Sequence, residues 1–118
     1  MSSESKHIEQ YSHNKSFLDN GFTDKNQYSD WAVTVTFYCG VHLVEAMLAK
    51  FGRNSEDHSD RRDNLKIIPT RNDFQDEYLD LYNLSRQARY DCINIGREQI
   101  FSAQSDLDAI HTAYRKLA

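Results

Sequence analysis

The 118-residue sequence predicts an all-α protein, an antiparallel up-and-down four-helix bundle with one short extra helix. Apolar residues recur every three or four positions along four long segments, and no stretch of useful length alternates as a strand does. Glycine and proline number four and one, and all except Gly40 fall between those segments. The composition, with 39% hydrophobic and 27% charged residues, is typical of a single compact domain with a well-solvated surface.

The first helix is expected over residues 4–20, with a stop at Gly21, because glycine commonly follows the last helical residue. Its apolar face is narrow, and the residues at helical spacing along it are Ile8, Tyr11, Lys15 and Leu18. The segment is polar elsewhere, so His7 and His13 are expected to face solvent. It has no apolar region of the kind that a secretory signal carries.

The second helix is expected to begin within residues 28–30 and to end at Gly52, with Ser29 or Asp30 as its N-terminal cap. It is apolar on nearly all sides, as a helix is when its neighbours enclose it. His42 and Glu45 interrupt the apolar run, which leaves the uncharged part too short to span a bilayer comfortably. A buried core helix is therefore the better interpretation.

A short third helix is expected near residue 60, within the stretch "NSEDHSDRRDNLKII" that precedes Pro69. Its candidate caps are Asn54, Ser55 and Ser59. A long fourth helix follows, with Thr70 as its cap. One face of that helix carries an aromatic stripe, formed by Phe74, Tyr78, Leu81, Tyr82, Ser85 and Ala88.

The last helix is expected after Gly96, where apolar residues alternate at spacings of three and four and form a narrow seam. The seam consists of Ile100, Ala103, Leu107, Ile110, Tyr114 and Leu117. It is expected to lie in the intramolecular core, with His111 beside it as a packed, neutral histidine. The short connections between the helices favour antiparallel neighbours, which completes the prediction of an up-and-down bundle.

A line of polar residues runs along one face of the second helix, since Thr34, Tyr38, His42 and Glu45 are spaced by four, four and three. A buried carboxylate requires a cation or several hydrogen-bond donors, because burying it unpaired is costly. We expect one of the arginines of the chain as the partner of Glu45, with Arg86 or Arg89 the first to check. The other arginines that the chain offers are Arg61 and Arg62.

The polar line has three interpretations. In the first, Glu45 accepts from an arginine and His42 bonds to a backbone carbonyl or a tyrosine, so that the line only fixes the register of the bundle. In the second, the line is the floor of a pocket with Tyr38, Arg86 and Arg89, in which His42 titrates near neutral pH. In the third, a carboxylate and a histidine contribute to a di-iron site, which requires a second such pair that no other helix clearly supplies. We expect neither a metal nor a cofactor.

The segment "RNSEDH" places Arg53 and Asn54 ahead of His58, with four residues between the arginine and the histidine. A small helical bundle with this motif resembles the HEPN superfamily, whose R-x(4–6)-H motif cleaves RNA without a metal. The wider stretches "DWAVTVTFYCGVHLVEAMLAKFG", "HSDRR" and "YLDLYNLSRQARY" look like a group of HEPN-like bacterial and archaeal proteins of largely unassigned function. The resemblance covers most of residues 28–91.

The resemblance implies a homodimer that binds RNA, or cleaves it as a metal-independent endoribonuclease, with two such motifs at a shared interface. His58 would act as base or acid, Arg53 would hold the phosphate through its planar guanidinium, and Asn54 would orient one of them. The same stretch has a structural interpretation as well. Glu56 and Asp57 are typical of a helix start, with the histidine and the arginines on a solvated face.

The alternative function is a non-catalytic interaction module, antitoxin-like or nucleotidyltransferase-associated, whose polar line is purely structural. Its partner would be a protein encoded by an adjacent gene. The net charge of −4 provides no global basic surface, so contact with RNA would require a local patch.

The two cysteines, Cys39 and Cys92, are far apart in the sequence and have no metal-ligand spacing. We therefore expect free thiols in a reducing compartment, and a cytoplasmic protein without a membrane partner. The tyrosines of the helical segments are expected mainly in the core, and they are Tyr78, Tyr82, Tyr90 and Tyr114.

Overall fold

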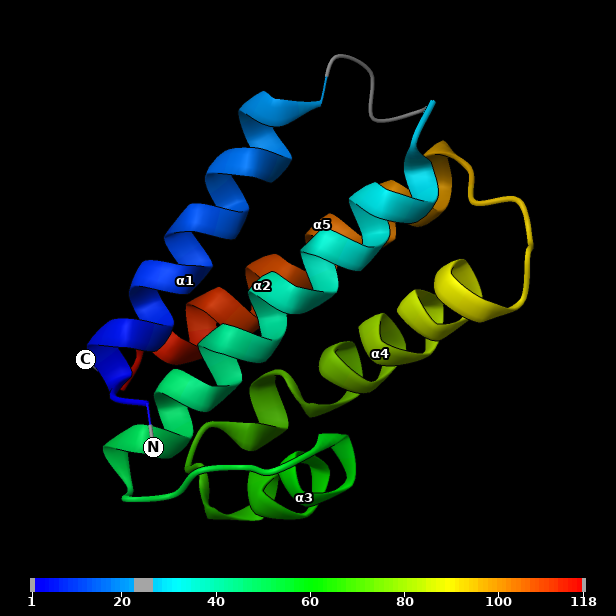
Figure 1. Cartoon of the computed structure of the whole chain (residues 1–118). Helices are drawn as coiled ribbons and strands as arrows, with labels where there is room; N and C mark the ends of the chain where they lie inside the picture. The colour runs from blue at the N-terminus through cyan, green and yellow to red at the C-terminus, as the bar shows by residue number, and fades with distance from the viewer. Residues whose placement is uncertain (1, 23–26, 118) are drawn as a thin grey trace.

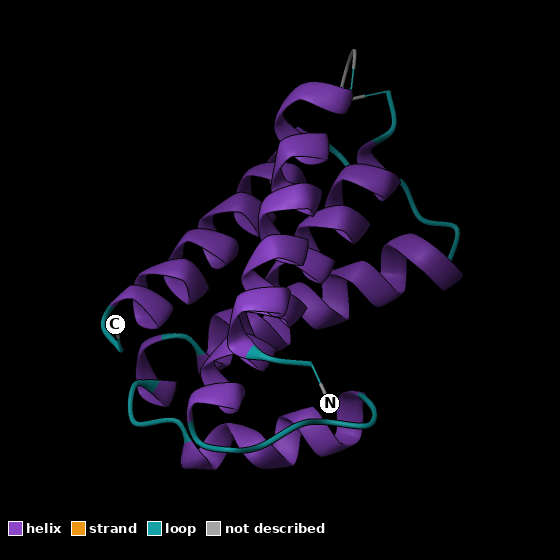
Figure 2. Ribbon diagram, turned by 60° about the vertical axis from the view of Figure 1, so that its left-hand side comes forward, coloured by secondary structure: helices purple, strands orange, loops and turns teal. Residues whose placement is uncertain are grey.

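The computed structural model describes residues 2–22 and 27–117, and every regular element within these ranges is helical (Figures 1 and 2). The five α-helices are α1 (Glu4–Ser16), α2 (Ser29–Lys50), α3 (His58–Asn64), α4 (Gln75–Tyr90) and α5 (Arg97–Arg115). Shorter helical turns continue α1 (Phe17–Gly21), extend α3 (Leu65–Ile67) and precede α4 (Arg71–Asp73). The predicted all-α bundle of four long helices and one short extra helix is confirmed.

The four long helices alternate in direction along the chain, and α2 contacts each of α1, α4 and α5 (Figure 1). The start of α1 lies beside the end of α5, where the Tyr114 hydroxyl donates a hydrogen bond to the Glu4 carboxylate. Lys50, the last residue of α2, pairs with the same carboxylate over 2.9 Å. Short helix α3 lies at this end of the bundle, between the end of α2 and the start of α4.

Helix α2 is the core of the bundle, and most of its 22 residues are buried. By length and composition alone it could cross a membrane, but 78% of its most apolar 18-residue stretch is buried against the rest of the bundle. Gly40 permits this close packing, because a Cβ atom there would lie 3.2 Å from Ile110 Cδ1 and 3.3 Å from Leu81 Cδ2. The prediction of an enclosed core helix is therefore confirmed.

The predicted apolar faces of α4 and α5 are also confirmed. On the α4 face Phe74, Tyr78, Leu81 and Ser85 are buried, and Tyr82 and Ala88 are half-buried. On the α5 seam Ile100, Ala103, Leu107 and Ile110 are buried, and Tyr114 and Leu117 are half-buried. Helix α1 buries no residue fully, in keeping with its narrow apolar face, and its Tyr11 ring lies 5.4 Å from the ring of His111.

The cap predicted for α2 is wrong. Tyr28 occupies the N-cap position, and its side chain makes no capping hydrogen bond. The Ser29 hydroxyl donates instead to the carbonyl oxygen of Ile95 over 2.5 Å, and this contact ties the start of α2 to the loop before α5. The Ser29 hydroxyl therefore makes a tertiary hydrogen bond and not the helix cap that the local sequence predicted.

The caps predicted for α3 and α4 are wrong as well. Helix α3 is capped by Asp57, whose carboxylate accepts from the Asp60 backbone N–H over 2.8 Å, and not by Asn54, Ser55 or Ser59. Thr70 precedes the short turn before α4, and its hydroxyl donates to the Ala113 carbonyl oxygen over 3.4 Å. Phe74 is the N-cap of α4. At α2 and α4 a tertiary contact thus takes the hydroxyl of Ser29 or Thr70, whereas at α3 another nearby residue, Asp57, supplies the cap.

The end of α2 agrees with its prediction at Gly52. Gly52 has φ +71°, a left-handed conformation that favours glycine. Its N–H bonds to the Ala49 carbonyl over 3.1 Å, and the Arg53 N–H bonds to the Leu48 carbonyl over 3.0 Å. These paired bonds form a Schellman motif, which stops the helix and directs the chain toward α3.

Candidate functional site

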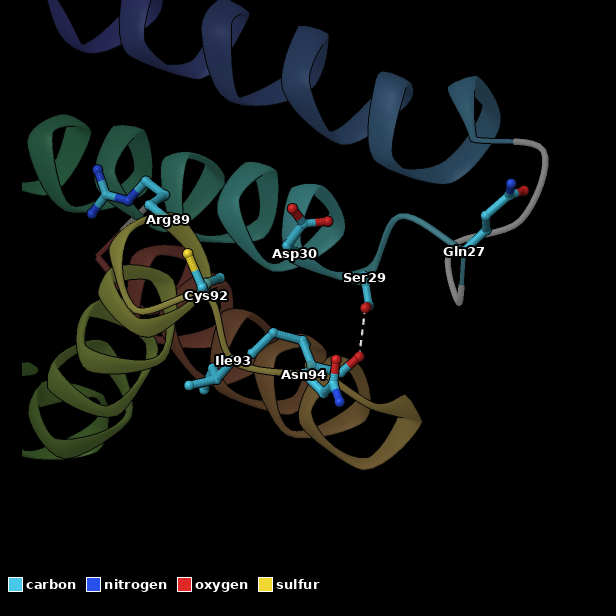
Figure 3. A pocket seen from close by; sticks show the side chains of 9 residues that line it. Gln27, Ser29, Asp30, Arg89, Cys92, Ile93 and Asn94 are labelled. Atoms are coloured by element: carbon cyan, nitrogen blue, oxygen red, sulfur yellow. Dashed lines mark hydrogen bonds between the residues drawn. The ribbon is translucent and has the colours of Figure 1, made fainter.

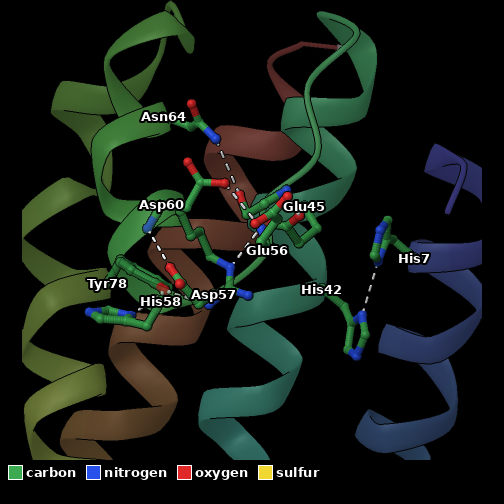
Figure 4. A network of polar contacts seen from close by, with 11 residues as sticks. His7, His42, Glu45, Glu56, Asp57, His58, Asp60, Asn64 and Tyr78 are labelled. Carbon is green, nitrogen blue, oxygen red and sulfur yellow. Dashed lines mark hydrogen bonds and ion pairs between the residues drawn. The ribbon is translucent and has the colours of Figure 1, made fainter. Parts of the chain in front are cut away.

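The carboxylate of Glu45 is buried, with 5% of the side chain exposed, and it is fully partnered (Figure 4). The Arg61 Nε donates to Oε2 over 2.9 Å, and the Ser55 backbone N–H donates to Oε1 over 3.1 Å. Glu45 therefore pairs with an arginine, as predicted, and among the four that the sequence offered the partner is Arg61, not Arg86 or Arg89. The reason is tertiary: α3 packs beside the second half of α2, where Glu45 lies, while the other two arginines are near the far end of α4.

The same network continues to His58 through Tyr78. The Arg61 Nη1 donates to the Tyr78 hydroxyl over 3.4 Å, and that hydroxyl lies 3.3 Å from His58 Nδ1. The hydroxyl can donate to Nδ1 or accept from it, so the ring proton of a neutral His58 can lie on either nitrogen. The Nε2 atom is buried and has no hydrogen-bond partner among the described residues.

The ring of His58 lies flat on the ring of Tyr82, with centroids 3.3 Å apart and planes inclined by 3°. Burial, followed by the positive charges of Arg61, Arg62 and Arg86, lowers the pKa of His58 to about 4. The imidazole is therefore neutral at pH 7, with one face on the Tyr82 ring, Nδ1 beside the Tyr78 hydroxyl and Nε2 buried.

The other residues of the HEPN-like motif lie apart from this ring. Arg53 and Asn54 are exposed in the loop that follows Gly52. Within residues 2–22 and 27–117, no hydrogen bond joins either side chain to His58. The motif thus consists of two solvent-exposed side chains and one histidine that is packed against α4.

A pair of histidines connects α1 with α2. His7 Nδ1 lies 3.0 Å from His42 Nδ1, and Figure 4 shows the two rings pointing toward one another. The expected partner of His42 was a carbonyl or a tyrosine, and His7 was expected in solvent, so both predictions were wrong. Burial lowers the pKa of both rings, the nearby Arg61 lowers it further, and Glu45 opposes the change. One Nδ1 must donate and the other must accept, which requires that at least one ring is neutral.

Farther toward the start of α2 along the polar line, Tyr38 contacts Arg89. Arg89 Nη1 donates to the Tyr38 hydroxyl over 3.3 Å, while Nε and Nη2 donate to the backbone and side-chain oxygens of Ser85, each over 3.2 Å. The guanidinium carbon lies 5.1 to 5.9 Å from the ring centroids of Phe37, Tyr38 and Tyr90. Arg86, the other predicted member, is exposed and lies 6.0 Å from the Tyr82 ring.

Two adjoining hollows flank Arg89, and together we call them the Arg89 groove. The smaller has a volume of 320 Å³ and is lined by Asp30, Trp31, Thr34, Tyr38, Ala88 and Arg89. The larger, of 590 Å³, shares Asp30, Ala88 and Arg89 and extends along residues 92–95 (Figure 3). The groove therefore lies between the start of α2, the end of α4 and the loop before α5.

Exposed aromatic side chains stand at the Arg89 groove. Trp31 is 59% exposed, Tyr38 is 41% exposed and Tyr90, which was predicted to be mainly core, is 66% exposed. Sequence reasoning included Tyr38 and Arg89 but missed Trp31. The available signal was spacing, because Trp31 precedes Thr34 and Tyr38 by three and seven residues and so extends the polar line by one helical turn.

The thiols of Cys39 and Cys92 are both free, as expected. Cys39 is buried in α2, and burial raises its pKa to about 12. Cys92 is exposed beside the Arg89 groove. Within the described ranges, no three side chains of His, Cys, Asp or Glu lie close enough together to hold a metal ion.

Comparisons of the chain with protein-family models, with curated proteins and with solved structures found no match. The geometry defines a compact all-helical protein of five helices. It contains a buried polar network at the end near α3 and an open aromatic groove at the far end of α4.

Proposed function

We propose that this protein is a non-catalytic, HEPN-like interaction module that binds a protein partner through the Arg89 groove. The observation that carries the proposal is the division between two sets of polar side chains. Glu45 and His58, which have the chemistry for acid–base work, and Arg61 beside them are occupied by internal contacts. The side chains that face solvent at a concave surface are those of Trp31 and Arg89, with Tyr38 between them.

The composition of the groove supports binding of a protein. Tryptophan, tyrosine and arginine supply most of the binding energy at protein interfaces, because each combines a large contact area with a hydrogen-bonding group. An exposed cluster of aromatic rings beside a hollow is uncommon on a surface that has no partner. The net charge of −4 favours a protein partner over a nucleic acid.

The buried network has a supporting part in this proposal. Glu45, Arg61, Tyr78 and His58 connect α2, α3 and α4 through hydrogen bonds between 2.9 and 3.4 Å. Since a buried polar network is stable only in the arrangement that satisfies its members, it fixes α4 relative to α2. The Arg89 groove is lined by residues of both helices, so its shape depends on the position of α4 relative to α2.

A metal-independent endoribonuclease, acting as a homodimer through Arg53, Asn54 and His58, is the second candidate. It is favoured by the neutral imidazole of His58, which has the cations Arg61, Arg62 and Arg86 nearby. A neutral base next to positive charge is what cleavage of a phosphodiester requires. In this role the buried Nε2 would have to become accessible when two copies associate.

The two candidates are separated by incubation of the purified protein with unstructured RNA in EDTA. We expect the RNA to remain intact. Because the nuclease candidate requires a homodimer, the oligomeric state of the protein is determined by sedimentation at the concentration used in the assay. Cleavage that disappears in Arg53→Ala and His58→Ala, with both variants folded by circular dichroism, would overturn the proposal in favour of the nuclease.

The binding role is tested by co-expression with the protein encoded by the adjacent gene, in the cytoplasm where we propose that both reside. We expect the two proteins to co-purify, and expect Trp31→Ala to abolish the complex. Arg115→Gln, at an exposed arginine near the end of α5, is the matched control that should retain it. Co-purification that is unaffected by Trp31→Ala would show that the groove is not the binding surface.

A further inference from the structure

We infer that the Arg89 groove is a receptor for a peptide segment of a partner protein, one that presents a carboxylate beside an apolar side chain. The inference rests on the proposed function and names the chemistry of the partner. It is carried by the way in which Arg89 is held, by the aromatic walls of the groove and by the balance of charge along it.

The guanidinium of Arg89 is fixed in direction. It donates three hydrogen bonds, one to the Tyr38 hydroxyl and two to oxygens of Ser85. Ser85 is fully buried, and its hydroxyl donates to the Tyr82 carbonyl over 2.9 Å, so the acceptor itself cannot rotate freely. An arginine whose orientation is already set loses little conformational entropy when it binds an anion.

Arg89 also retains the donors that an anion would use. A guanidinium has five N–H groups, and the three bonds above use one on each nitrogen. One N–H on Nη1 and one on Nη2 therefore have no acceptor among the described residues. Two donors match the two oxygens of a carboxylate, which arginine commonly binds in bidentate fashion.

The aromatic rings around Arg89 strengthen such a contact. Phe37, Tyr38 and Tyr90 lie with their ring centroids within 5.9 Å of the guanidinium carbon and displace water from its sides. A charge pair that is partly shielded from water interacts more strongly than one at an open surface. Within the part of the chain that the structure describes, no carboxylate forms an ion pair with Arg89.

The smaller hollow supplies a place for the apolar part of the ligand. Its volume of 320 Å³ is at the lower end of the range of roughly 300–1,000 Å³ that is usual for ligand sites. Trp31 and Tyr38 form its aromatic sides, next to the guanidinium of Arg89. This volume suits one apolar side chain better than an extended cofactor.

The charge balance favours a peptide over RNA. Among the described residues, Arg89 is the one cation that lines either hollow, and the carboxylate of Asp30 lines both. A nucleic-acid strand carries a phosphate at every nucleotide and is bound by grooves with several cations. A peptide presents a single carboxylate together with backbone N–H groups. The Asp30 carboxylate can accept hydrogen bonds from those N–H groups.

Trp31 provides the experiment, because it is the single tryptophan of the chain. The protein is titrated with the blocked dipeptide N-acetyl-Phe-Asp-amide, with its Asn counterpart and with oligouridylate, and the fluorescence of Trp31 is followed. We expect saturable binding of the Asp peptide, with about tenfold weaker binding of the Asn peptide, as for loss of a charge-assisted bidentate contact.

Variants connect the signal to Arg89. Arg89→Gln should weaken binding of the Asp peptide about tenfold and remove the preference over the Asn peptide. Tyr38→Phe removes one hydroxyl that orients Arg89 and keeps the ring, so it should weaken binding of the Asp peptide less. It also provides a second test of the inference if the Arg89→Gln protein does not fold. Arg115→Gln, at an arginine outside the groove, should bind as the parent protein does.

The outcomes distinguish this inference from the proposed function. Equal affinity for the Asp and Asn peptides, or no binding of either, overturns the inference. Tighter binding of oligouridylate overturns it in favour of RNA. If the adjacent-gene partner still co-purifies in a Trp31-dependent manner while the Asp peptide does not bind, the proposed function stands and only the inferred chemistry fails.

Discussion

Arg61 Nε donates a hydrogen bond to Glu45 Oε2 over 2.9 Å, and this contact joins α3 to the core helix α2. Both side chains are largely removed from water, with 13% and 5% of their surfaces exposed. The second carboxylate oxygen accepts from the Ser55 backbone N–H, so the loop between the two helices is held as well. The pair therefore determines where α3 lies.

Glu45→Gln should lower the free energy of unfolding by about 1 to 3 kcal/mol, because Arg61 would lose its charged partner while it remains buried. Urea denaturation of the parent and variant proteins measures this change. Arg61→Gln should be at least as destabilising, since it leaves the carboxylate buried. The double variant should be less destabilised than the sum of the two single changes. Unchanged unfolding midpoints in both single variants would contradict the pairing.

The sequence predicted that Glu45 needs an arginine, but not which one. The need follows from local facts, namely a carboxylate in an apolar helix. The choice depends on where the chain returns after Gly52, and Arg61 approaches Glu45 because α3 folds back on α2. His7 and His42 illustrate the same limit, since their contact joins residues 35 positions apart and requires the docking of α1.

Helix faces were predictable because three-to-four spacing is a property of the sequence itself. The buried residues of α4 and α5 accordingly agree with the pattern. The Arg89 groove was only half predictable, since Tyr38 and Arg89 stood out as polar residues in core helices. Trp31 did not stand out, because an aromatic residue in an apolar helix is ordinarily buried, and here 59% of it is exposed.

Acid should destabilise the protein partly through His58. Its pKa of about 4 lies below the ordinary value of 6.5, so the unfolded chain binds this proton more readily than the folded protein does. The free energy of unfolding should then decrease as the pH falls from 6.5 to 4. His58→Phe keeps a flat ring against Tyr82 and removes the titration, so its unfolding midpoint should vary less over this range. An equal pH dependence in both proteins would argue against a half-buried, neutral His58.

Asp106 should have the opposite effect. Burial, followed by the negative charges of Asp80 and Glu77, raises its pKa from 3.8 to about 6. The folded protein therefore holds this proton more tightly than the unfolded chain, and the resulting stability is lost as the pH rises from 3.8 through 6. Asp106→Asn should raise the melting temperature at pH 8 and change it little at pH 4. Asp108→Asn, at an exposed residue of the same helix, is the control, and a gain at both pH values for Asp106→Asn would disprove the mechanism.

The His7–His42 contact should make the docking of α1 sensitive to acid. With one ring protonated the hydrogen bond between the two Nδ1 atoms persists, but with both protonated two N–H groups face each other over 3.0 Å. Because burial lowers the pKa of both rings, docking is stable above the ordinary histidine value of 6.5 and weakens as the pH falls below it. Glu4, which pairs with Lys50 and Tyr114, and the Tyr11 ring beside His111 also hold α1, so acid should weaken its docking and not abolish it.

Cys39 reports the release of α1, because its thiol is buried and the charged groups that act on it, Lys15 and Asp19, belong to α1 and the turn that continues it. In a Cys92→Ser protein, dithiodipyridine should modify Cys39 faster as the pH is lowered from 7 to 5. The rate is compared at each pH with that of the exposed Cys92 in a Cys39→Ser protein, which corrects for the effect of pH on the thiol reaction itself. His7→Gln can keep a hydrogen bond to His42 without a second positive charge, so its Cys39 should stay protected at pH 5. If Cys39 reacts equally fast in the parent and His7→Gln proteins at that pH, the histidine pair does not control the docking of α1.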